Sequence, residues 1–197
     1  VEVDGKKVLF TGDFREHGIV GEKNTLEKLM NTYIKKADVL ITEGTMLSRI
    51  EEAKHNSIQT EKDLGECAKK LFRENKETVI LVSSTNLDSI MEFYHALPWG
   101  MDFVCDAYQA KLIRIAMADK GKYYAKYRPE MIHGRPRRFY IVGDMEGLGA
   151  EQNCYRADFS ILKNKGFTML ARENKPMFQK IMAKFQDPLI IYSKWTG

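Results

Sequence analysis

Val-Leu-Phe-Thr-Gly-Asp-Phe-Arg, residues Val8–Arg15, is the stretch of this sequence that decides the fold. Its first four residues are aliphatic, aromatic or β-branched, as expected for a strand, and Gly12 then allows the backbone to turn. The strand therefore places the carboxylate of Asp13 at its carboxyl end. In α/β proteins this end holds ligands and metals, because strand ends are rigid while the loops that follow vary in chemistry.

A second stretch repeats this design further along the chain. Ala37–Thr42 has the composition of a strand, and Glu43 follows it directly. If the two strands are neighbours in one parallel sheet, Asp13 and Glu43 face the same crevice, as a metal ligand and a proton-transfer group require. The alternative is that each acid only caps the segment after its strand, because acidic residues are common near helix N-termini. Spacing alone leaves both interpretations open.

Several motifs resemble those of a known family. Thr11–Arg15, followed by Ile41–Thr45 (Ile-Thr-Glu-Gly-Thr), resembles the metallo-β-lactamase fold in its β-CASP branch of nucleic-acid hydrolases. In that family the aspartate of the Gly-Asp pair bridges two metal ions, and the acid of the second motif marks the entry to an inserted cap domain. Segments that resemble parts of this cap domain are Leu81–Asn86, Cys105–Gln109 and Ile190–Trp195.

The resemblance implies a metal-dependent hydrolase, a nuclease that cleaves phosphodiesters of RNA or DNA. Two zinc ions would lower the pKa of a bridging water, with Asp13 as a metal ligand and Glu43 as the catalytic residue that orients a ligand or passes a proton. The family's His-x-His-x-Asp-His motif is absent, and no two of the four histidines have zinc-ligand spacing. We therefore expect this chain alone to be inactive and to hold no zinc cofactor, as a fragment of a parent that supplies the remainder of the metallo-β-lactamase core.

The remaining sequence alternates strand and helix patterns, which predicts an α/β fold with a mainly parallel sheet and helices on both faces, as in Rossmann-like domains. We expect residues 1–45 to be the end of the metallo-β-lactamase-like core and residues 46–197 to be the β-CASP-like cap, with the chain truncated at both ends. Expected strands of the cap are Thr78–Val82, Met101–Cys105, Arg138–Val142, Phe167–Leu170 and Pro188–Tyr192. Expected helices open at Thr60, Asn86, Asp106 and Lys175.

Two segments are candidates for substrate binding. Hydroxyl and amide groups at the strand-to-helix turn Ser83–Asn86 can form an anion cradle, in which Ser84, Thr85 and Asn86 contact phosphate. The alternative is an ordinary helix N-cap, a role that Asn86 alone would fill.

The second candidate segment is Lys120–Arg138, where seven basic residues against one acidic residue give a net charge of +6. Three tyrosines lie among these charges, a pattern that suits single-stranded RNA or DNA. Arg135, Arg137 and Arg138 are the predicted phosphate contacts. The alternative is an ordinary solvated surface, which is the commoner role of a charged run.

Composition agrees with a globular α/β domain. The 197 residues are 44% hydrophobic and 29% charged, enough for a sizeable core, and no apolar run approaches the length of a membrane span. Three widely spaced cysteines, Cys67, Cys105 and Cys154, indicate buried thiols of a cytoplasmic protein, with Cys67 on the apolar stripe of a helix. The alternative function is a non-catalytic Rossmann-like module that binds a nucleotide or a protein.

Overall fold

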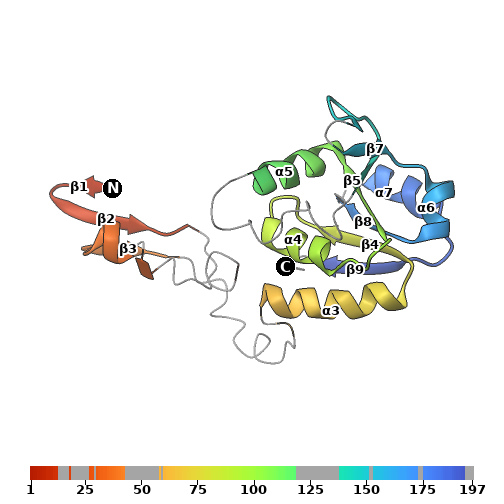
Figure 1. Cartoon of the computed structure of the whole chain (residues 1–197). Coiled ribbons are helices and arrows are strands. Elements are labelled where there is room, and N and C mark those ends of the chain that lie inside the picture. The colour runs from red at the N-terminus through yellow and green to blue at the C-terminus, as the bar shows by residue number, and fades with distance from the viewer. Residues whose placement is uncertain are drawn as a thin grey trace. The chain divides into compact units, whose positions relative to one another are not determined.

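The computed structural model describes residues 1–12, 18, 27–28, 30–42, 58, 60–118, 138–150, 153–172 and 175–193. The chain forms two compact units, residues 1–63 and 64–197, each with its own sheet (Figure 1). The domain boundary predicted after residue 45 falls outside the described residues. Each unit is considered by itself below.

The first unit contains a three-stranded sheet of order β1-β2-β3. β1 (Glu2–Val3) and β2 (Lys6–Phe10) form an antiparallel hairpin. The two turn residues between them, Asp4 and Gly5, both have positive φ, as the favoured two-residue hairpin turns require. β3 (Val39–Ile41) pairs with β2 in parallel, in the register Val8↔Val39 and Phe10↔Ile41. A π-helical turn, Met30–Ile34, lies between these two strands in the sequence.

The second unit contains a six-stranded sheet of order β7-β6-β5-β8-β4-β9, in which every pair of neighbours is parallel. Its strands are β4 (Glu77–Val82), β5 (Asp102–Asp106), β6 (Phe139–Val142), β7 (Cys154–Arg156), β8 (Phe167–Ala171) and β9 (Leu189–Ser193). Its helices are α3 (Glu61–Glu74), α4 (Leu87–Ala96), α5 (Ala107–Ala118), α6 (Phe159–Lys165) and α7 (Lys175–Met182). The predicted α/β class with a mainly parallel sheet is confirmed.

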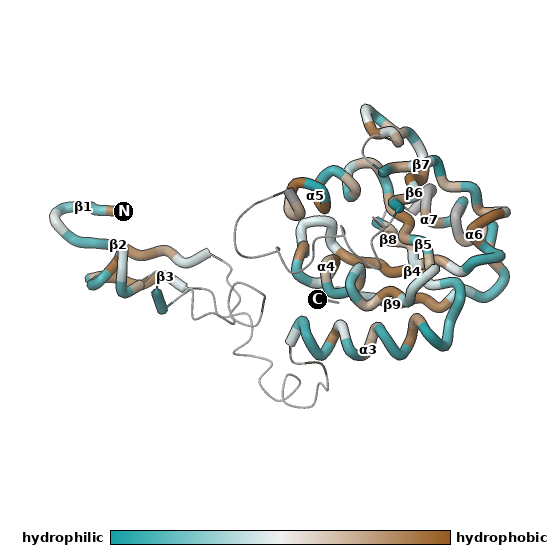
Figure 2. The backbone as a smooth tube through the Cα atoms, in the orientation of Figure 1, coloured by the Kyte–Doolittle hydropathy of each residue, from teal (hydrophilic) through white to brown (hydrophobic). Residues whose placement is uncertain are grey.

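Helices cover both faces of this sheet (Figure 1). On one face, Tyr94 of α4 lies against Phe103 of β5 and Phe139 of β6, with ring centroids 5.2 and 5.6 Å away. On the other face, β-strand residues such as Val104 and Met169 pack with Leu162 of α6 and with partly buried side chains of α7. Phe103 and Val104 are successive residues of one strand, so their side chains point to opposite faces and contribute to both layers. The strands of this sheet are hydrophobic along most of their length (Figure 2).

Capping side chains fix where several helices begin. Thr60 and Asp63 form a reciprocal cap at the start of α3, in which the Asp63 amide donates to Thr60 Oγ1 over 3.1 Å and the Thr60 amide donates to Asp63 Oδ2 over 2.9 Å. Asp158 caps α6 by accepting from the Ser160 amide. The predicted helix start at Thr60 is therefore confirmed, and so is the predicted start of α4 after Asn86.

The structure corrects three expectations. β7 and α6 were absent from the predicted set, because β7 has only three residues at the sheet edge and α6 only seven. Cys67 is exposed, not buried. The buried stripe of α3 runs through Glu61, Gly65, Ala68 and Phe72, and one residue on a helix turns the side chain by about 100°, so Cys67 lies off this stripe.

Within the described part of the chain, no helix has both the length and the apolar character needed to cross a bilayer.

Candidate functional site

The chain leaves the sheet toward opposite faces at neighbouring strands around β8. The connections after β4 and β5 begin with α4 and α5, which share one face, whereas the connection after β8 contains α7 on the other face. β8 lies between β4 and β5 in the sheet. Parallel α/β sheets bind ligands outside the carboxyl ends of strands at such a reversal. The carboxyl end of β8 is therefore the place to look for a site.

The loop after β4 contributes hydroxyl and amide groups to this edge. Ser83 Oγ and Thr85 Oγ1 lie 3.0 Å apart and share a hydrogen bond. Asn86 occupies the N-cap position of α4 but makes no capping hydrogen bond through its side chain; its Nδ2 donates instead to Ser89 Oγ over 2.7 Å. Ser84 is buried, and its Oγ has no hydrogen-bond partner among the described residues. The Asn86 side chain therefore does not cap α4, although the residue occupies the N-cap position.

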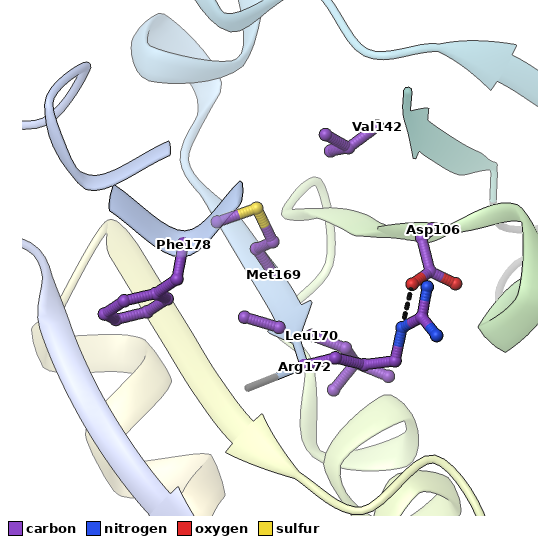
Figure 3. A pocket seen from close by; sticks show the side chains of 7 residues that line it. Asp106, Val142, Met169, Leu170, Arg172 and Phe178 are labelled. Atoms are coloured by element: carbon purple, nitrogen blue, oxygen red, sulfur yellow. Dashed lines mark hydrogen bonds and ion pairs between the residues drawn. The ribbon is translucent and has the colours of Figure 1, made fainter. Parts of the chain in front are cut away.

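Asp106, the last residue of β5, makes two kinds of interaction through its carboxylate. Asp106 Oδ1 accepts from the Gln109 amide over 2.8 Å, and Gln109 Oε1 accepts from the Asp106 amide over 3.2 Å, which is a reciprocal cap on α5. The predicted capping role of Asp106 is confirmed. Its second oxygen, Oδ2, accepts from Nε of Arg172, the first residue after β8, over 2.5 Å. Figure 3 shows this pair at the rim of a small pocket.

Arg172 also lies against an aromatic ring. Its guanidinium carbon is 5.4 Å from the ring centroid of Tyr108, which is on α5 next to the Asp106 cap. Both the Arg172 side chain and Tyr108 are exposed by nearly half. The carboxylate and the ring together restrict the orientation of this partly exposed guanidinium.

The pocket beneath this pair is small. Its lining is mostly apolar and comes from β5, β6, β8 and α7, with Met169 and Phe178 prominent (Figure 3). The cavity volume is about 10 Å³, which is room for at most one water molecule. Any larger ligand at this edge would therefore bind over the outer side of the Arg172 guanidinium.

Arg138, a predicted substrate contact, lies elsewhere. It directly precedes β6, so it is at the amino edge of the sheet, whereas Ser84, Thr85 and Asn86 follow β4 at the carboxyl edge. A hydrogen bond with Tyr140 raises the pKa of the Arg138 guanidinium, whose carbon is 5.3 Å from the ring centroid of Tyr155. The described candidates thus form two separate groups, and a single phosphate cannot contact both.

Asp13, Glu43, Arg135 and Arg137 lie outside the described residues. The described ranges stop just before each acid, one at Gly12 and the other at Thr42. There the Thr11 amide donates to the Ile41 carbonyl over 3.0 Å, and the Thr11 hydroxyl donates to Thr42 Oγ1 over 3.2 Å. The two strands therefore end side by side, as the shared-crevice hypothesis requires.

Zinc, which the family resemblance implies, has no site within the described residues. No group of three or more His, Cys, Asp or Glu side chains comes together there in a way that could hold a metal ion. These residues do not fit a zinc centre by themselves, and we derive no chemical step through one.

Sequence reasoning missed Arg172. The signal was available, because Arg172 directly follows the buried strand Phe167–Ala171, just as Asp13 follows its own strand. Only the strand order, which puts β8 between β4 and β5, shows that this arginine lies at the reversal point and beside Asp106.

Comparison with known proteins supports the fold. No protein-family model and no curated protein matches the sequence. A solved structure, a protein of unknown function from Enterococcus faecalis V583, is similar to 97% of this chain with a TM-score of 0.60 and 18% sequence identity. The chain spans about half of that structure, 47% of its length. At this identity the likeness extends to the fold alone.

Proposed function

We propose that this chain is part of a metal-dependent phosphodiesterase, a nuclease acting on RNA or DNA, to which it contributes two elements. The first unit supplies Asp13 as a metal ligand and Glu43 as the catalytic acid, and the second unit grips the nucleic acid. The observation that carries this proposal is the parallel pairing of β2 and β3, with the Thr11 and Thr42 hydroxyls 3.2 Å apart. Asp13 and Glu43 follow Thr11 and Thr42 within two residues, so a crevice shared by the two acids is the simplest arrangement.

The second unit supports the gripping role through the chemistry of its carboxyl edge. The Ser83–Asn86 loop brings hydroxyl groups to the start of α4, where backbone N–H groups and the helix dipole favour anions. A phosphodiester is the anion that a nuclease must hold. The solved structure of similar fold is about twice as long as this chain, and in this proposal the remaining metal ligands belong to a longer parent protein.

We place the protein in the cytoplasm. None of Cys67, Cys105 and Cys154 forms a disulfide, as expected where thiols are kept reduced. Burial raises the pKa of the Cys105 thiol, with smaller contributions from Asp106 and Cys154, so this thiol stays protonated and unreactive at neutral pH.

The proposal is tested in the longer parent protein with zinc, using single-stranded RNA and DNA of the same sequence as substrates. Asp13→Asn should abolish hydrolysis and reduce the bound metal, because it removes a charged ligand. Glu43→Gln should lower turnover while leaving the metal content nearly unchanged, because a proton donor does not hold the metal. Asp4→Asn is the matched control in the same unit, since Asn also suits the positive φ of that hairpin turn.

Each possible result has a distinct meaning. Full activity of the Asp13→Asn variant would refute the assignment of Asp13. Equal loss of metal in both variants would make Glu43 a ligand or a structural residue. A metal-loaded parent that hydrolyses neither RNA nor DNA would refute the nuclease and favour the non-catalytic Rossmann-like binding module.

The basic segment Lys120–Arg138 has its own test, binding of short RNA across a salt series. If Arg135, Arg137 and Arg138 contact phosphates, their joint replacement by Ala should flatten the salt dependence by about two to three units, because each contact releases a counterion. Tyr124→Ala should weaken binding by roughly 1–3 kcal/mol with little change in slope, since stacking releases no counterion. An unchanged slope in a normally folded triple variant would assign the segment to a solvated surface.

A further inference from the structure

Arg172, Asp106 and Tyr108 are chemistry-bearing side chains that the proposed function does not use. We propose that Arg172, held by Asp106 and Tyr108 at the carboxyl end of β8, binds a phosphate group. This inference rests on the proposed function only in taking nucleic acid as the source of that phosphate. The reasons lie in the donors that remain on the guanidinium, in the way its plane is fixed, and in the groups beside it.

The guanidinium has unused donors. An arginine side chain carries five N–H donors, and Arg172 uses one of them, Nε–H, to Asp106 Oδ2. Its two Nη nitrogens have no hydrogen-bond or ion-pair partner among the described residues. They form the outer edge of the planar group, which is the edge that binds two phosphate oxygens at once.

Asp106 acts as a positioning residue for this guanidinium. Its carboxylate cannot rotate freely, because Oδ1 accepts the Gln109 amide over 2.8 Å at the start of α5. Part of its negative charge is balanced there by the N-terminal end of the helix. The ion pair therefore orients Arg172 without cancelling the attraction that its outer edge exerts on an anion. The Tyr108 ring restricts the guanidinium plane from another direction.

Two further polar groups near this edge lack partners among the described residues. They are Ser84 Oγ in the loop after β4, 9% exposed, and Gln109 Nε2 on α5, 1% exposed. The register Leu81↔Ala171 puts Arg172 opposite Val82, one residue before the Ser83–Asn86 loop begins. The loop and Arg172 therefore follow neighbouring strands at the same carboxyl edge of the sheet. Buried polar atoms without partners are uncommon in folded proteins, and a small group such as a water molecule or an ion is one explanation for them.

The ligand class follows from what the site can accommodate. The apolar cavity beneath the pair is of about 10 Å³ and cannot take a ring or an aliphatic chain. The remaining N–H donors of Arg172 belong to a side chain that is 47% exposed, and they match an anion with several oxygens. A phosphate group fits this description, whether it is free, on a mononucleotide or within a nucleic-acid strand.

The test is binding to the complete 197-residue chain without metal, followed by NMR of the arginine Nε–H signals. The probes are inorganic phosphate, adenosine 5′-monophosphate and a short single-stranded RNA, which distinguish the three sources of phosphate. We expect the Arg172 signal to shift on addition of a probe. Arg172→Lys should weaken binding about tenfold, because a lysine keeps the charge but cannot present the planar pair of donors.

Arg73→Lys is the matched control. Arg73 is an exposed arginine in the last turn of α3, just before β4, and therefore at the opposite edge of the same sheet. Its replacement should leave the affinity unchanged. Thermal unfolding of each variant verifies that both remain folded.

Three results would overturn the inference: no binding of any probe to the unmodified chain, unchanged affinity in Arg172→Lys, or equal loss of affinity in Arg73→Lys, which would indicate general charge attraction. Failure of the proposed function looks different. A parent protein that hydrolyses no nucleic acid while Arg172 still binds phosphate would refute the nuclease and leave this site in place.

Discussion

The two sheets of this protein are built from similar strands, but their described residues differ in burial. All five residues of β8 in the six-stranded sheet are buried. In the three-stranded sheet β2 and β3 have no fully buried residue, and the apolar side chains of Phe10 and Leu40 are 68% and 58% exposed. Parallel strands are normally packed on both faces. The sequence pattern of a strand thus predicts that the segment joins a sheet. It does not predict which helix or strand packs against that sheet.

The first prediction separates the two sheets by dividing the chain. We expect residues 58–197 to unfold in one cooperative transition and residues 1–57 to show none, because the described strands of the small sheet are short and contain no buried residue. The division precedes Thr60 so that the cap on α3 is kept. Circular dichroism during urea unfolding measures both pieces and the whole chain. A cooperative transition in residues 1–57 would show that the small sheet has a core of its own.

The second prediction compares one phenylalanine from each sheet. Phe167 of β8 is fully buried and its ring lies 5.0 Å from that of Phe185, whereas Phe10 of β2 is mostly exposed. Phe167→Ala should lower the free energy of unfolding by about 3–5 kcal/mol through lost burial and the cavity that remains. Phe10→Ala should change it by no more than about 0.5 kcal/mol. Similar losses from both would mean that the Phe10 face is covered within this chain.

The same contrast shows what could be predicted from sequence. The strands at Thr78–Val82, Met101–Cys105 and Phe167–Leu170 were expected because continuous apolar runs bounded by polar turns are typical of strands buried on both faces. All are present, with shifts of at most one residue at either end. The starts of helices could be predicted equally well, because the residues of each capping pair are close in sequence. These pairs are Thr60–Asp63 and Asp106–Gln109.

Features that depend on strand order were not predictable in this way. No local pattern places β8 between β4 and β5, and that order creates both the reversal point and the Arg172–Asp106 pair across 66 residues. The same reasoning named both Ser84 and Arg138 as substrate-binding residues but did not place them relative to each other, and they lie at opposite edges because they follow and precede their strands. Candidate residues can be chosen from sequence, but their grouping requires the topology.

The third prediction compares a glycine from each unit. Gly166 ends α6 with φ +86°, and a Cβ there would lie 3.0 Å from the backbone oxygen of Lys76. Gly12, after β2, has φ +59° and open space where its Cβ would be. Gly166→Ala should cost about 1–3 kcal/mol of unfolding free energy, because strain and crowding add. Gly12→Ala should change the free energy of the same transition by no more than about 0.5 kcal/mol, because Gly12 belongs to the unit that is expected to show no transition of its own. A larger effect at Gly12 in urea unfolding would show that the small unit takes part in the cooperative transition.

The smallest expected effect concerns the cap on α6, one of the helices that cover the larger sheet. Hydrogen bonds from the Ser160 hydroxyl and amide lower the pKa of Asp158. A carboxyl whose pKa is lower in the folded protein stabilises it above the unfolded value, about 3.9, and this contribution is lost as the pH falls below it. Asp158→Asn keeps an oxygen acceptor for the cap but does not titrate.

The stability difference between the natural chain and Asp158→Asn should therefore be present at neutral pH and shrink toward pH 3, with a magnitude below that of Gly166→Ala. Thermal unfolding at a series of pH values measures it, and Asp158→Ala, which loses the cap at every pH, is the control. A difference that stays constant with pH would mean that the charge of Asp158 adds nothing to its cap. The packing of α6 on the larger sheet would then be stabilised by apolar contacts. The described residues of the three-stranded sheet show no such burial.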